Sequence, residues 1–143
     1  MRAAARRLTR RLGRRGALLT LKGIMAAGYG FGQIVQPTGD HDGLALLLKL
    51  QPLDVWGWAW IIAGVIALAC AWVPARRDWP GFLAVWLIAT PWAMAYLLSW
   101  WPLGASSRGW VVAMIFGAFG AVCLVAIGWD EPPPARSEPP RET

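Results

Sequence analysis

The segment GWVVAMIFGAFGAVCLVAIGW, residues 109–129, contains no charged side chain over 21 positions. As an α-helix it would be about 30 Å long, which matches the hydrocarbon thickness of a lipid bilayer. An apolar run of this length with no interruption predicts a membrane-spanning helix rather than a helix in a soluble core.

Three further apolar runs precede this segment, at about residues 16–35, 53–73 and 81–101. The short basic turn from Pro74 to Asp78 predicts that the second and third runs form antiparallel neighbouring helices. The chain is 57% hydrophobic and 15% charged, whereas soluble domains average about 25% charged residues. The sequence therefore predicts an all-α polytopic membrane protein with four transmembrane helices in a domain spanning residues 16–129.

The first run differs from the others because it contains a lysine, Lys22, near its basic end. The aliphatic stem of a lysine can extend along the helix to the headgroups, so Lys22 requires no buried partner. If this segment instead lay on the membrane surface, three spans would remain.

The segments outside the spans are basic, short or rich in proline. Residues 1–15 carry half of the 14 Lys and Arg residues and read equally well as an amphipathic surface helix or as a disordered leader. Leu44–Leu50 is too short to span and is expected to lie in the interface or to re-enter the bundle. His41, between two aspartates, is expected in a solvated loop, because adjacent residues rarely converge on one metal ion. The Pro-rich tail, residues 130–143, is predicted to be disordered.

Basic residues are distributed unequally between the two predicted sides of the membrane. Eleven lie in the leader, the second loop and the tail, whereas the opposite side has only Lys49 and Arg108. The positive-inside rule places both termini in the cytoplasm, so we expect a multi-pass protein of a bacterial cytoplasmic (inner) membrane. Next to apolar runs, the basic residues indicate lipid-headgroup contact and topology rather than nucleic acid; the candidates are Arg6, Arg7, Arg10, Arg11, Arg14, Arg15, Arg76 and Arg77.

Tryptophan is unusually frequent, with 11 residues. Indole favours the membrane interface, because its ring is apolar while its N–H group seeks a partner. Trp60, Trp86 and Trp92 fall deeper and are expected to pack between helices. The residues predicted to anchor span ends in the interface are Trp56, Trp58, Trp72, Trp79, Trp100, Trp101, Trp110 and Trp129.

Two sets of small residues, spaced by four, are candidates for close helix packing. Gly28 and Gly32 form one pair, and Ala113, Gly117 and Ala121 form the other set. Small side chains let helix backbones approach closely in lipid. Either set could pair helices within the chain or in a homo-oligomer.

No motif for catalysis, metal binding or cofactor binding is present. The sequence lacks a phosphate-binding glycine loop, zinc-ligand spacing and a nucleophile with a plausible base. Aspartate and glutamate are absent from the span interiors, although carboxylates there are common in ion-coupled transporters. We therefore predict a non-enzymatic protein without cofactor or metal, whose first partner is the lipid bilayer.

Several stretches at span ends resemble a known group of proteins. They are RRLGRRGA at residues 10–17, PLDVWGW at 52–58, RGWV at 108–111 and GWDEP at 128–132. They resemble small four-helix transmembrane proteins of unassigned function encoded by actinobacterial phages and prophages. The resemblance implies a phage-type protein in the host membrane, with no activity to assign to residues.

Two functions are compatible with these features. The first is a non-catalytic anchor or interaction subunit that binds another membrane or phage protein. The alternative is a holin-like or lysis-associated protein, which would accumulate and assemble into membrane lesions.

Overall fold

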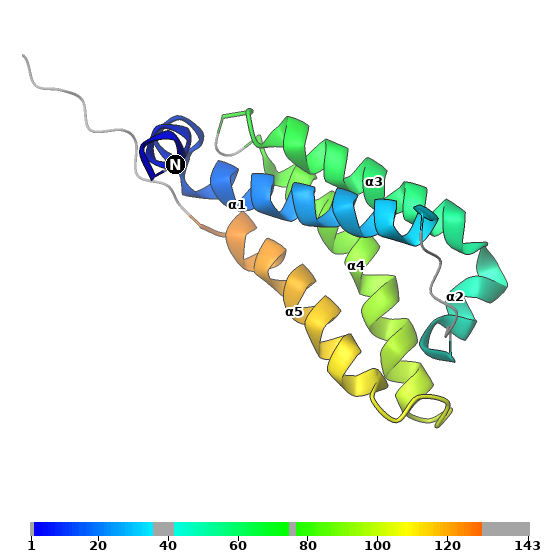
Figure 1. Cartoon of the computed structure of the whole chain (residues 1–143). Helices are drawn as coiled ribbons and strands as arrows, with labels where there is room; N and C mark the ends of the chain where they lie inside the picture. Colours follow the sequence, from blue (N-terminus) through cyan, green and yellow to red (C-terminus); the bar gives the residue numbers. More distant parts are fainter. Residues whose placement is uncertain (1, 36–41, 75–76, 130–143) are drawn as a thin grey trace, which may run out of the picture.

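The computed structural model describes residues 2–35, 42–74 and 77–129, and all its regular elements are helices. Within these ranges, side chains are described from Gly13 onward, except that of Asp42. The elements are α1 (Arg2–Val35), the short η1 (Asp42–Leu44), α2 (Ala45–Leu50), α3 (Leu53–Cys70), α4 (Trp79–Trp100) and α5 (Gly109–Ile127) (Figure 1).

Four of these helices are long and apolar enough to cross a membrane: Gly13–Val35 within α1, then α3, α4 and α5. Their bounds lie within three residues of the expected spans. Large apolar side chains such as Ile62, Leu87 and Ile115 are exposed, as expected for helices that face lipid rather than water. The chain is thus an all-α polytopic membrane protein with four spans.

Helix α1 changes direction at Gly13, which has a φ of 68° and a ψ of −179°. A positive φ is accessible to glycine because it has no Cβ, whereas other residues would be strained there. Gly13 therefore separates the helical leader, residues 2–12, from the first span (Figure 1). Of the two alternatives for the leader, the structure has a helix.

Helices α1 and α3 pack together through four glycines spaced by seven residues. Gly23 lies against Gly64, and Gly30 lies against Gly57. A Cβ added to Gly64 would be 2.7 Å from the Ala27 nitrogen and 2.7 Å from the Gly23 oxygen. Only glycine allows the two backbones to approach this closely.

Helices α4 and α5 join this pair to form a wedge-shaped bundle. Helix α4 packs against both α3 and α5, while α1 and α5 have no comparable backbone contact. In Figure 1, α1 and α5 are closest near the start of the first span and diverge toward the other ends. Two buried clusters lie along the wedge, one around Trp60 and Trp92 and the other around Leu19 and Phe82.

The short η1–α2 segment packs against α4, next to Tyr96 in its C-terminal half. Leu44 and Leu47 are buried, and the Gly43 backbone lies against the Tyr96 ring. Trp56 Nε1 donates a hydrogen bond of 3.2 Å to the Leu47 carbonyl oxygen. The segment therefore lies against the helix bundle rather than apart from it.

Candidate functional site

One face of α1 carries three polar side chains at seven-residue intervals: Arg15, Lys22 and Tyr29. Residues seven apart lie on the same face of a helix after two turns. All three reach α5 or the residues directly after it, through contacts with Trp129, Phe119 and, for Tyr29, the Phe116 ring. Long side chains thus link the two helices whose backbones diverge.

Arg15 forms the first link, which we call the Arg15 clasp. Its Nε and Nη2 atoms donate to Asp78 Oδ2 at 2.9 Å and Oδ1 at 2.7 Å. Its Nη1 atom donates to the carbonyl oxygens of Ile127 at 3.2 Å and Trp129 at 2.7 Å. Arg15 is 5% exposed and Asp78 is 2% exposed. The clasp therefore joins the starts of the first and third spans to the end of the fourth with a charge-balanced, bidentate pair.

Lys22 forms the second link, deeper in the bundle. Its Nζ atom donates a hydrogen bond of 2.7 Å to the Phe119 carbonyl oxygen and lies 3.6 Å from the centre of the Phe119 ring. The residue is 7% exposed, so the expected extension to the headgroups is wrong. Inside an apolar bundle, the carbonyl dipole and the face of the aromatic ring stabilise the ammonium group. The lipid-facing surface of α1 offers neither.

Beyond Lys22, aromatic rings from four helices pack together. The Tyr29 ring contacts Trp60 and Trp92 edge to face, with centroids 5.0 and 5.3 Å apart. Phe116 lies 5.8 Å from Trp60 and is stacked on Tyr96 at 6.1 Å. Trp60 and Trp92 are 1% and 0% exposed, which confirms that both pack between helices. Offset and edge-to-face rings give the bundle a rigid centre.

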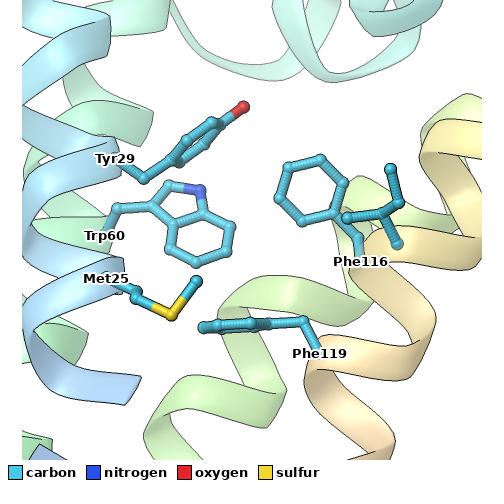
Figure 2. A pocket seen from close by; sticks show the side chains of 6 residues that line it. Met25, Tyr29, Trp60, Phe116 and Phe119 are labelled. Atoms are coloured by element: carbon cyan, nitrogen blue, oxygen red, sulfur yellow. The ribbon is translucent and has the colours of Figure 1, made fainter. Parts of the chain in front are cut away.

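The divergence of α1 and α5 leaves a cavity of about 240 Å³ beside these rings. Figure 2 shows Tyr29, Trp60 and Met25 along one wall and Phe116 and Phe119 along the other. Met25 and Ile115 are 51% and 61% exposed, so they form a rim that faces lipid. We call this the aromatic cavity, and its lining is Met25, Tyr29, Trp60, Ile115, Phe116 and Phe119.

A second hollow, of about 440 Å³, lies between α4 and α5. We call it the α4–α5 groove. Small residues contribute to its lining, and a Cβ added at Gly117 would meet nothing within 4 Å. The larger side chains along it are exposed and therefore face lipid. Its lining is Ala93, Met94, Leu97, Trp100, Trp110, Ala113, Met114 and Gly117.

The small residues predicted for helix packing differ in their burial. Ala113 is buried, but Gly28, Gly32, Gly117 and Ala121 are exposed. No atom lies within 4 Å of a Cβ added at Gly28 or Gly32. These four residues therefore make no close helix contact within the chain, whereas α1 and α3 meet at glycines spaced by seven. Their role in contacts between chains stays a prediction.

Most of the predicted tryptophan anchors lie on the outside of the bundle. Trp56 differs, because it is half-buried and bonded to Leu47. The other seven are between 44% and 72% exposed, which leaves their rings free to reach an interface; they are Trp58, Trp72, Trp79, Trp100, Trp101, Trp110 and Trp129.

The basic residues predicted for headgroup contact also differ in their exposure. Arg77 is exposed, and the Arg14 guanidinium lies 5.5 Å from the Trp129 ring centre. For Arg15 a headgroup contact is wrong, because its guanidinium is buried against Asp78. Side chains are not described for Arg6, Arg7, Arg10 and Arg11, and Arg76 lies outside the described residues.

Sequence reasoning missed both cationic links and the glycines that pack α1 on α3. The signal was present in the repeats Arg15–Lys22–Tyr29 and Gly16–Gly23–Gly30, each spaced by seven. His41 and residues 130–143 lie outside the described residues. Among the described residues, no group of three or more His, Cys, Asp and Glu side chains could hold a metal ion.

Family models, curated proteins and solved structures give no match to this chain.

Proposed function

We propose that this chain is a non-catalytic interaction subunit that binds the transmembrane helix of a partner protein in the α4–α5 groove. The observation that carries the proposal is the groove itself, a hollow of about 440 Å³ on the lipid-facing side of α4 and α5.

The lining of the groove has the chemistry of a helix-binding surface. Ala93, Ala113 and Gly117 contribute small side chains, which allow a second helix to approach closely in lipid. Met94 and Met114 are 48% and 64% exposed, and methionine adapts its shape to a partner surface. The groove thus offers packing contacts that a smooth helix face lacks.

The charged side chains inside the bundle have structural contacts. Arg15, Lys22 and Asp78 each bond to protein atoms and link helices. The aromatic cavity and the α4–α5 groove are lined almost wholly by apolar side chains, which suits packing against an apolar helix. The resemblance to phage and prophage membrane proteins suggests the host cytoplasmic membrane as the location.

A photo-crosslinking amino acid at Met114, which lines the groove, tests the proposal. The chain is expressed in a bacterial membrane, irradiated and purified in mild detergent. We expect a crosslinked partner that Gly117→Leu removes, because a leucine side chain fills the groove. Gly28→Leu is the matched control, since Gly28 is exposed on α1 with nothing within 4 Å.

Three outcomes separate the alternatives. A partner that survives Gly117→Leu, or that only Gly28→Leu removes, contradicts binding in the groove. Absence of any crosslink also contradicts it. If the partner is a second copy of the chain, the groove builds a homo-oligomer, and abrupt growth arrest with membrane depolarisation on induction then identifies the holin-like alternative.

A further inference from the structure

The helical leader, residues 2–12, is joined to the first span by a turn that requires glycine. Gly13 has a φ of 68° and a ψ of −179°, a backbone conformation that is essentially restricted to glycine. In Figure 1 the leader turns away from the direction of the span instead of continuing it. Because a span crosses the bilayer along its own axis, a helix that turns away at the end of the span can run along the membrane surface.

The turn lies at the level of the membrane interface. Arg14, the first residue after it, lies 5.5 Å from the centre of the Trp129 ring. Arg15 pairs with Asp78, which directly precedes Trp79. Both tryptophans are about half exposed, and indole prefers the membrane–water interface. The leader therefore begins where the phospholipid headgroups are.

The leader has the residue pattern of an amphipathic helix. At 3.6 residues per turn, its apolar residues share one stripe, which consists of Ala4, Ala5, Leu8 and Leu12. The positions around that stripe hold the arginines, which are Arg2, Arg6, Arg7, Arg10 and Arg11. Helices with a basic polar face and an apolar stripe lie in the interface plane and are attracted to anionic lipids.

The chain supplies too few acidic groups to neutralise the leader. Residues 1–35 contain no aspartate or glutamate, and Asp78 is buried in its pair with Arg15. The tail, residues 130–143, contains four acidic residues but also two arginines. Full neutralisation therefore requires anions from outside the chain, and in the plane of the interface these are the phosphates of anionic phospholipids.

We propose that the leader binds anionic phospholipids as an arm that the turn at Gly13 sets along the membrane surface. Its arginines bind lipid phosphates, and its apolar stripe enters the interface. Arg77, which is exposed next to Asp78, adds a further cation at this end of the bundle. The inference concerns the choice of lipid and is independent of the α4–α5 groove.

The full chain is tested in nanodiscs of phosphatidylcholine, alone or mixed with phosphatidylglycerol. A nitrobenzoxadiazole fluorophore is attached to the cysteine introduced by Leu8→Cys, in a chain that also carries Cys70→Ala and Cys123→Ala. Dithionite in the buffer reduces the fluorophore faster when water reaches it. We expect slow reduction in the anionic nanodiscs and fast reduction in phosphatidylcholine, with the difference decreasing as salt is added.

Two variants separate the effect of charge from that of geometry. Arg6→Gln removes one charge, so reduction in the anionic nanodiscs should become about fivefold faster at low salt. Gly13→Ala keeps every charge but opposes the turn, so it should also speed reduction there. Gly28→Ala is the matched control, because it makes the same change at an open position of α1 and should leave the rate unchanged.

Four results would overturn the proposal. Equal rates in the two kinds of nanodisc would show that the leader does not select anionic lipid. Equal effects of Gly13→Ala and Gly28→Ala would show that the turn has no part in binding. A dependence on phosphatidylglycerol that appears only in a chain ending at Trp129 would assign the arginines to the acidic tail. Faster reduction after addition of duplex DNA at physiological salt would assign them to nucleic acid.

Discussion

Lys22 Nζ lies 2.7 Å from the carbonyl oxygen of Phe119, a residue 97 positions later in the chain. Arg15 makes a second contact of this kind with Trp129, also at 2.7 Å. Helices α1 and α5 are therefore joined by two cationic side chains that bond to backbone carbonyls. Such links hold the helices at a distance and leave room between them for the aromatic cavity.

Lys22→Met should loosen the link between α1 and α5. The variant loses a hydrogen bond from a charged donor, worth about 2 kcal/mol, and the cation–π contact with Phe119. Spin labels at Leu21 and Val122, both exposed, report the separation of the two helices by pulsed electron resonance when Cys70 and Cys123 are replaced by alanine. We expect a broader distance distribution.

Lys22→Arg serves as the control for that measurement, because it keeps a charged donor on a long stem. Its distribution should stay narrow. An unchanged distribution in Lys22→Met would show that Arg15 and the packing of α4 hold α5 without Lys22.

The Arg15 clasp should contribute strongly to stability. Removing one partner of a buried pair leaves an uncompensated charge, so Arg15→Met and Asp78→Leu should each cost about 3–5 kcal/mol. The double variant should recover part of that loss. Unfolding by a harsh detergent, followed by tryptophan fluorescence, measures these differences, and Arg77→Met at an exposed neighbour should change stability by less than about 0.5 kcal/mol. Additive losses in the double variant would contradict direct pairing.

Gly64→Ala should separate α1 from α3. The added methyl group would lie 2.7 Å from backbone atoms of Ala27 and Gly23, which must move apart. Overpacking of this kind costs about 1–3 kcal/mol. Gly28→Ala makes the same change on the same helix pair at an open position, so it should leave stability unchanged or slightly raised. The melting temperature in detergent decides between them, and equal effects would disprove close packing at Gly64.

Reporter fusions test the orientation in the membrane. The Arg15 clasp holds the start of the first span beside the end of the fourth, so both lie on one side, and the basic residues predict that this side is the cytoplasm. A reporter after Asp42 should be active only outside the cytoplasm, and one after Thr143 only inside. Cytoplasmic activity of the reporter after Asp42 would show that the first apolar run does not cross the membrane.

The spans could be predicted from the sequence because hydrocarbon imposes a simple length requirement on apolar runs. The burial of Trp60 and Trp92 could also be predicted, since both lie far from the span ends. These features depend on position along one helix and on the thickness of the bilayer, not on which helix is the neighbour.

The contacts between helices could not be predicted from the four-residue spacing of Gly28 and Gly32. Helices that stay in contact over their whole length meet at about every seventh residue, which is the spacing of Gly23 and Gly30. The pairing of Arg15 with Asp78 depends on how three spans assemble. Neither residue differs in its local sequence from other charged residues near the span ends.

The Arg15 clasp has a consequence for biosynthesis. A ribosome delivers Asp78 with the start of the third span but delivers Ile127 and Trp129 only with the end of the fourth. The glycine contacts between α1 and α3 need nothing beyond Gly64. The pair of α1 and α3 can therefore form early in membrane insertion. Arg15 completes its hydrogen bonds last, and these bonds stabilise the fully assembled chain.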